Sequence, residues 1–247
     1  MEKVKTKIPT PVLNSPNFEN VFGGKDRLSL NVDEKGHIRA LEFIALPNTI
    51  FEVIETNHNI YKVKTSIYPL EPLYIDKRFT ALPSKADIIN IKRPEKSDIL
   101  QKLVSLQGLP YLLGGNYSKG INEMLLFYPP NKNIDSKMLK KWCLKGVDCS
   151  GLLYEATNGF TPRNTSELVD YGTAIFLDSS LQALDLIAWR GHVIIVLNED
   201  FCIESKENTG VVITPLKKRL DQVAKEKTFS TTIEKQNKDL FTIRRWL

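Results

Sequence analysis

The amino-acid sequence predicts an α+β protein in which a helix packs on an antiparallel sheet, preceded by a small β-barrel. Three observations support this fold class. Short β-like runs broken by turns fill residues 26–82. An apolar helical stretch begins at Asp148-Cys149 and ends at Asn158-Gly159, a pair that typically stops a helix. Strand-like runs separated by turns then follow between residues 186 and 215.

The chain divides into four parts on these patterns. Residues 1–25 are predicted to be an N-terminal extension that wraps the surface, and residues 26–82 to be the barrel, because many short strands in a small segment favour a closed sheet. Residues 83–96, with two prolines, are interpreted as a linker. The second domain is predicted over 97–247, opening with a helix that Ser97 caps.

Cys149 is the candidate nucleophile because it stands at the start of a predicted helix. The free N–H groups and positive dipole end of a helix start favour an anion. We therefore expect the pKa of this thiol to fall below its ordinary value of about 8.5, which would supply the reactive thiolate. The alternative is a buried, inert cysteine.

His192 is the candidate general base. The chain has three histidines, and two of them, His37 and His58, lie in turn sequences. Only His192 opens a strand-like run, and a strand holds an imidazole at a fixed angle better than a loop does. A histidine at a strand start without a chemical task is the alternative.

Glu204 is the candidate group to orient the imidazole. Asn198-Glu199-Asp200 is a turn signal between two strand runs, which predicts a hairpin. With a loop centred on Asn198, His192 and Glu204 would face each other across the hairpin on one side of the sheet. An exposed glutamate at a strand end is an equal alternative on spacing alone.

The segments around Cys149, His192 and Glu204 resemble the motifs of the NlpC-type cysteine peptidases, a papain-like family of bacterial cell-wall metabolism. The resemblance covers about residues 97–247. Six segments follow the order of that family: Pro110–Gly115, Asp148–Leu152, Thr161–Ser166, Leu184–Ile187, Gly191–Val193 and Glu204. The resemblance implies a papain-like domain with Cys149 on a helix and His192 on the sheet. In this family an SH3-like domain often precedes the catalytic one, which suits residues 26–82.

Several positions depart from the family pattern. Leu113 stands where Trp is usual, Leu184 replaces a usual Gly, and Glu204 replaces the commoner His, Asn or Gln. The stretch 116–147 is longer than the family needs, and we interpret it as an insertion with a short helix over 136–142. Insertions of this length often have a function, and the hypothesis is that this one lines or covers the substrate groove.

The resemblance implies a peptidase that cleaves the γ-D-glutamyl–diaminopimelate bond of peptidoglycan-derived peptides. In relatives with an SH3-like domain, the residues flanking the nucleophile bind the free amine of an N-terminal L-Ala, which points to Asp148 and Ser150. Asp148 as a plain helix cap is equally plausible. Tyr111 is expected beside the oxyanion-binding N–H of Cys149. The rival functions are an amidase or acyltransferase with the same Cys-His pair, a non-catalytic wall-peptide binding module, and an exported effector.

Composition and charge limit the partners, cofactors and locations expected for the chain. The charge of +5 is scattered, without a basic stripe carrying interleaved aromatics, so no nucleic-acid partner is expected. No segment has the length and apolarity of a membrane span or a signal peptide. Three cysteines define no disulfide framework, and no Cys/His cluster has zinc spacing, so neither a metal nor a cofactor is expected. These features favour a cytoplasmic location, with non-classical export as the alternative, and leave the oligomeric state open.

Overall fold

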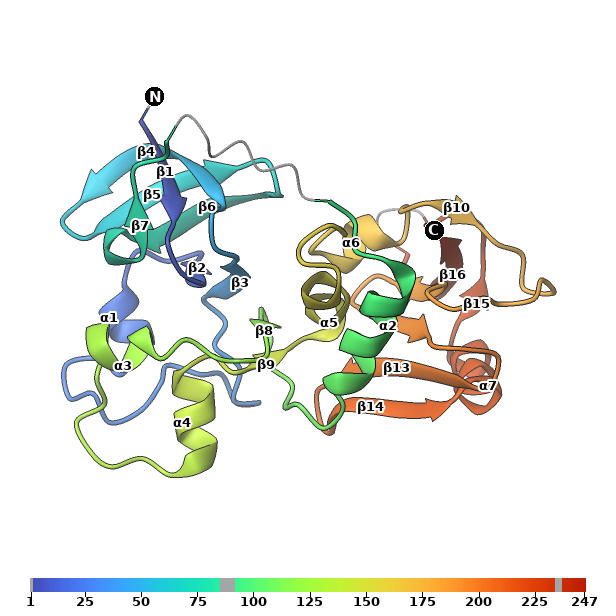
Figure 1. Cartoon of the computed structure of the whole chain (residues 1–247). Helices are drawn as coiled ribbons and strands as arrows, with labels where there is room; N and C mark the ends of the chain where they lie inside the picture. The colour runs from blue at the N-terminus through green and yellow to red at the C-terminus, as the bar shows by residue number, and fades with distance from the viewer. Residues whose placement is uncertain (1, 85–91, 234–236) are drawn as a thin grey trace. The chain divides into compact units, whose positions relative to one another are not determined.

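The computed structural model describes residues 2–84, 92–233 and 237–247 (Figure 1). The described residues form two compact units. Of the described residues, the first unit contains 2–84 together with 112–146, and the second contains 92–111 together with 147–233 and 237–247. The chain therefore leaves the first unit, visits the second, and returns before the second is completed.

The first unit is built on an antiparallel sheet whose seven strands, within the described residues, run in the order β3-β2-β6-β5-β4-β1-β7. Its apolar residues alternate with exposed ones, so one face closes over a core that includes Phe43 and Phe51. The strands are β1 (Lys3–Thr6), β2 (Thr10–Leu13), β3 (Leu41–Ala45), β4 (Ile50–Asn57), β5 (Ile60–Thr65), β6 (Tyr68–Asp76) and β7 (Thr80–Ala81).

The predicted boundary between an extension and a barrel is not where the structure puts it. The segment 1–25 supplies β1, β2 and the short helix α1 (Phe18–Val21), so it is part of the sheet and its core. The run 28–32, predicted as a strand, is irregular, and Leu30 alone among its apolar residues is buried. Of the predicted linker 83–96, residues 85–91 lie outside the described residues.

The segment 116–147, predicted as an insertion in the second domain, packs almost entirely in the first unit. It forms β8 (Asn116–Tyr117), α3 (Glu123–Phe127), α4 (Ser136–Trp142) and β9 (Gly146–Val147). Trp142 is fully buried in a core shared with Phe18 and Phe22. The Tyr128 hydroxyl donates to the buried carboxylate of Asp76, 2.5 Å away. The segment thus completes the N-terminal unit, which explains its length.

Within the described residues, the second unit packs four helices around a largely antiparallel sheet of order β10-β16-β11-β12-β13-β14, with β15 pairing in parallel to β16. Its helix α2 (Lys96–Ser105) begins one residue before Ser97, and its N-cap is Glu95, so Ser97 is not the cap that the sequence predicted. The other elements are α5 (Cys149–Ala156), α6 (Thr165–Leu168), β10 (Thr173–Ala174), β11 (Leu186–Trp189), β12 (His192–Val196), β13 (Phe201–Lys206), β14 (Gly210–Pro215), α7 (Leu216–Glu226), β15 (Thr228–Phe229) and β16 (Leu240–Arg245).

Packing within this unit places α5 between α2 and the sheet. Figure 1 shows α2 and α5 side by side, and α5 also contacts β12 and β13. All eight residues of α5 are buried, because the helix is apolar nearly all round rather than along one stripe. The central helix is thus held from several sides, which fixes its first residue, Cys149, against the sheet.

Candidate functional site

Cys149 is the first residue of α5, as the sequence predicted. Asp148 is the N-cap, and its side chain accepts a hydrogen bond from the backbone N–H of Gly151 at 2.7 Å. This cap satisfies one of the free donors at the helix start and fixes where the helix begins. The thiol therefore has a defined position at the end of the helix that points toward the sheet.

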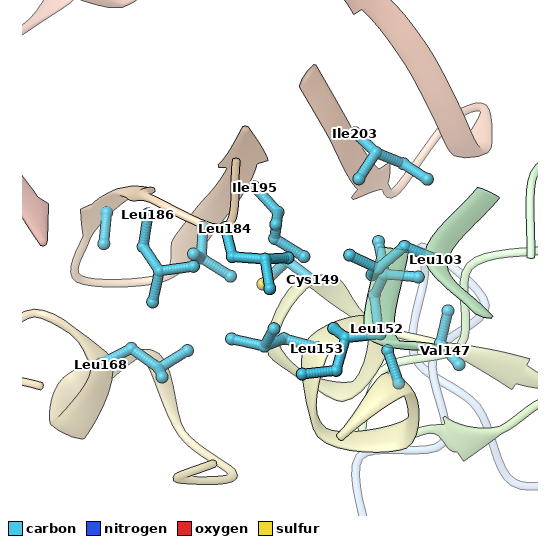
Figure 2. Close-up of a cluster of buried hydrophobic side chains, with 14 of the residues drawn as sticks. Leu103, Val147, Cys149, Leu152, Leu153, Leu168, Leu184, Leu186, Ile195 and Ile203 are labelled. Atoms are coloured by element: carbon cyan, nitrogen blue, oxygen red, sulfur yellow. The ribbon is translucent and has the colours of Figure 1, made fainter. Parts of the chain in front are cut away.

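The protonation state of Cys149 differs from the prediction. Its side chain lies among apolar residues, including Leu184 and Ile195 (Figure 2), and is 6% exposed. Burial raises the pKa of this thiol to about 12, and the Asp148 carboxylate adds to the rise. Arg163 and the backbone N–H groups of Val193 and Ser150 oppose it. The expected fall in pKa at a helix start is thus outweighed by desolvation, and Cys149 rests as a neutral thiol.

The backbone around His192 lies against the Cys149 sulfur. The thiol donates to the carbonyl oxygen of Gly191, with Sγ 3.7 Å from that oxygen, and the N–H of Val193 also points to the sulfur. Both contacts flank His192 in the chain. The structure therefore brings the helix and strand together at the two residues that the sequence singled out, 43 positions apart.

A tight turn positions His192 at the edge of this contact. Trp189 pairs with His192 across β11 and β12, so Arg190 and Gly191 are the whole connection between the strands. Gly191 has φ +103°, a conformation that favours glycine. Its N–H donates to the Thr165 hydroxyl at 3.1 Å, which ties the turn to α6. The Thr161–Ser166 motif thus supports the histidine turn.

Glu204 contacts His192, although the hairpin register differs from the prediction. Ile195 pairs with Ile203 and Val196 with Cys202, so the hairpin turns about Glu199 rather than Asn198. Glu204 consequently lies diagonal to His192 on the same face instead of directly opposite. The two side chains still meet, with Nε2 of the imidazole 2.7 Å from Oε2 of the carboxylate.

The sequence did not predict the partner of Glu204 on α7. The Arg219 guanidinium donates through Nε to Oε1 at 2.6 Å and through Nη2 to Oε2 at 3.0 Å. Glu204 is fully buried, and burial alone would raise its pKa. Hydrogen bonds from His192 and Arg219 outweigh that cost and lower the pKa to about 2. One feature of the sequence could have indicated this partner. It is the basic run Lys217-Lys218-Arg219 at the start of an amphipathic helix.

Asp148 and Ser150, the predicted amine-binding residues, contact Arg163. Its guanidinium donates to both carboxylate oxygens of Asp148, at 3.0 and 2.6 Å, and to the Ser150 hydroxyl at 2.9 Å. All three residues are at least 90% buried. Arg163 appeared in the sequence only as part of a motif, and its pairing with Asp148 was not predicted. The pair neutralises the charge beside the nucleophile.

Tyr111 also lies in this neighbourhood. Its backbone bridges to Val147, one residue before Asp148. Burial raises the pKa of its hydroxyl, and the charges of Asp148 and Cys149 raise it further. Tyr111 is therefore a neutral phenol close to both side chains, where the sequence placed it.

The described residues contain neither a metal-type cluster nor a membrane-length apolar helix. Within 2–84, 92–233 and 237–247, no three His, Cys, Asp or Glu side chains gather as they would around a metal ion. No helix in the described part of the chain combines the length and apolarity of a membrane span. All three cysteines are free and buried.

The arrangement has the parts that acyl transfer requires. Acyl transfer by a thiol needs a nucleophile, a base and a group that orients the base. Here the Cys149 thiol contacts the backbone beside His192, and Nε2 of His192 contacts Glu204. With Nε2 hydrogen-bonded to the carboxylate, Nδ1 is the ring nitrogen left free of that bond and able to exchange a proton. The N–H groups at the start of α5 can bind a developing oxyanion.

Comparison with known proteins gives likenesses at low similarity. No protein-family model matches the chain, and no curated protein sequence does. An NlpC/P60 family protein from Bacillus cereus is 19% identical, with a TM-score of 0.39 over 100% of this chain and 64% of that one. NlpC1 from Trichomonas vaginalis is 14% identical, with a TM-score of 0.38 over 98% of this chain and 68% of that one.

A third similar structure is RipD from Mycobacterium tuberculosis, described as a non-catalytic NlpC/p60 domain protein adapted to peptidoglycan binding. It is 16% identical, with a TM-score of 0.40 over 63% of this chain and 100% of that one. This chain spans 64% of the length of the Bacillus cereus protein.

Proposed function

We propose that the protein is a cysteine peptidase that hydrolyses an amide bond in peptidoglycan-derived peptides. The single observation that supports this most is the contact of the Cys149 thiol with the backbone on both sides of His192, whose ring is in turn held by Glu204. A nucleophile, a base and an orienting acid in contact are the requirements for covalent catalysis of acyl transfer.

The mechanism begins from a neutral thiol. His192 accepts the Cys149 proton as the sulfur attacks the amide carbonyl carbon, and the carbonyl oxygen becomes an oxyanion bound by the Cys149 N–H. The C–N bond then breaks, and the leaving amine takes the proton from the imidazolium. A water molecule loses a proton to His192, attacks the thioester and releases the acid, returning the thiol.

For the substrate, we propose the γ-D-glutamyl–diaminopimelate bond of turnover fragments that carry a free N-terminal L-Ala. The six ordered motifs support this choice. Asp148 and Ser150 are the proposed amine ligands, and because Arg163 already donates to both, an ammonium group would have to share the Asp148 carboxylate with it. We further propose that the sheet of the first unit is SH3-like, as the strands over 41–81 suggest.

The test is product analysis by mass spectrometry with a matched pair of substrates, L-Ala-γ-D-Glu-diaminopimelate and its N-acetylated form. The proposal expects release of L-Ala-γ-D-Glu from the free tripeptide and at least tenfold slower release from the acetylated one. Equal rates would contradict the amine site. Binding of the tripeptide without cleavage would favour a wall-peptide binding module, and cleavage only of other amides or esters would favour an amidase or acyltransferase.

A further inference from the structure

Glu204 is unusual in being an ionised carboxylate that no solvent reaches. It is 0% exposed and lies between the imidazole of His192 and the guanidinium of Arg219. Removing a carboxylate from water is costly unless cations or strong donors replace the water. His192 supplies one hydrogen bond, and Arg219 supplies two at fixed geometry. The Arg219 guanidinium therefore donates most of the hydrogen bonds that replace water around the Glu204 carboxylate.

Arg219 is well placed to control the orientation of the carboxylate. It extends from the first turn of α7, which follows β14 directly and packs on β13 and β14. Its side chain is only 14% exposed, so little freedom remains to it. Contact with both carboxylate oxygens sets the plane of the Glu204 side chain. That plane determines which lone pair Oε2 presents to Nε2 of His192.

We propose that Arg219 is a positioning residue for the proposed reaction, acting through Glu204 on His192. Arg219 holds the Glu204 side chain ionised and in one plane. The carboxylate can then only accept hydrogen bonds. Nε2 must then donate, and Nδ1 remains the proton acceptor for Cys149. A protonated or rotated Glu204 would allow the opposite tautomer, in which Nδ1 carries the hydrogen and cannot accept the thiol proton. The inference rests on the proposed function of the Cys149–His192 pair.

The charged groups around Glu204 and Arg219 make the proposed role of Arg219 testable through the pH dependence of activity. Several elements contribute titratable or charged groups near Glu204 and Arg219 in the described chain: His192 on β12, Cys202 and Lys206 on β13, and Arg219 and Glu226 on α7. Lys206 is the other cation, with Nζ 3.6 Å from Oε1. Loss of the Arg219 charge makes a protonated imidazole beside Glu204 easier to form, so the base is lost at higher pH.

The test compares Arg219→Gln, Arg219→Lys and the control Lys218→Gln, an exposed charge on the same helix. For Arg219→Gln we expect kcat/KM at pH 6 to fall at least tenfold and the acid limb of the pH profile to move up by at least half a pH unit. Arg219→Lys keeps the positive charge but loses the two-point contact with the carboxylate. We therefore expect kcat/KM to fall while the acid limb of the pH profile stays where it is in the wild type. Lys218→Gln leaves both unchanged.

A second variant separates positioning from folding. In Glu204→Gln/Arg219→Gln, a neutral amide accepts from Nε2 and needs no counter-charge, so we expect higher activity than in Arg219→Gln alone. A merely structural Arg219 would lower activity equally at every pH, with no gain in the double variant, and that result would overturn the proposal.

A third readout needs no turnover. In Cys149→Ala, ¹⁵N NMR of the imidazole should show neutral His192 with its hydrogen on Nε2, and adding Arg219→Gln should populate the Nδ1–H form. An unchanged tautomer would contradict the role of Arg219 even if the protein proves not to be a peptidase. Absence of peptide cleavage by the wild type would instead count against the proposed function alone.

Discussion

The Nε2 atom of His192 lies 2.7 Å from Oε2 of Glu204, between side chains of adjacent antiparallel strands. This hydrogen bond restrains the orientation of the imidazole. Trp189 packs on the same ring, with centroids 5.0 Å apart. The base is thus held by two strands, and its geometry depends on the sheet rather than on a loop.

The first prediction concerns acid stability. Glu204 has a pKa of about 2 in the folded protein against an ordinary 4.5, so its ionised form stabilises the fold above pH 4.5. That contribution is lost as the pH falls from 4.5 toward 2. Urea unfolding should show the stability advantage of wild type over Glu204→Gln shrinking by about 2 kcal/mol between pH 6 and pH 3. A pH-independent difference would contradict the ion pair.

The second prediction concerns the reactivity of the thiol. Because burial raises the pKa of Cys149 to about 12, its thiolate fraction should rise about tenfold per pH unit through the neutral range. Alkylation by iodoacetamide, followed by peptide mass spectrometry, should therefore accelerate steadily from pH 6 to pH 9 at Cys149. A rate that is already maximal and flat between pH 6 and pH 8 would reveal a thiolate–imidazolium pair at rest and refute the neutral thiol.

The third prediction concerns the pair beneath the nucleophile. Arg163→Met leaves the Asp148 carboxylate buried without its bidentate partner, because both side chains are less than 10% exposed. We expect a loss of about 3–5 kcal/mol in the free energy of unfolding. Lys217→Gln is the matched control, since its pair with Asp221 is solvent-exposed and should contribute less than about 1 kcal/mol. A small loss in Arg163→Met would mean that water or another side chain replaces the guanidinium.

The fourth prediction concerns the turn before His192. In Gly191→Ala the added Cβ meets no atom within 4 Å, so the cost is the backbone strain at φ +103° alone. We expect a loss of roughly 1–3 kcal/mol and a fall in kcat, because the turn sets the Gly191 carbonyl and His192. Gly210→Ala adds a clash with the Leu109 carbonyl at 2.2 Å and should destabilise more. The reverse order in thermal denaturation would contradict this account.

The second unit was predictable because its local patterns are strong. The strand-like runs predicted between residues 186 and 215 are observed as β11, β12, β13 and β14, since each is an apolar run between turn signals. The positions of Cys149 at a helix start and His192 at a strand start follow from the same patterns. The structure brings Tyr111, Asp148 and Ser150 to the same neighbourhood.

The rest depended on tertiary packing, which no local pattern reports. The pKa of Cys149 was predicted to fall because a helix start favours an anion, but apolar residues from distant segments bury the thiol. Arg163 and Arg219 reach Asp148 and Glu204 across 15 residues each, so their pairing was not visible in sequence spacing. The segment 116–147 belongs to the first unit because its apolar residues complete the core around Phe18 and Phe22.

The fifth prediction concerns the role of Cys149 as the nucleophile. Mass spectrometry would follow L-Ala-γ-D-Glu-diaminopimelate incubated with wild type, Cys149→Ala and the control Cys202→Ala, a buried cysteine bonded to Thr214 on the sheet. The account predicts release of L-Ala-γ-D-Glu by wild type and Cys202→Ala, and no release by a folded Cys149→Ala. Cleavage that persists in Cys149→Ala would contradict it.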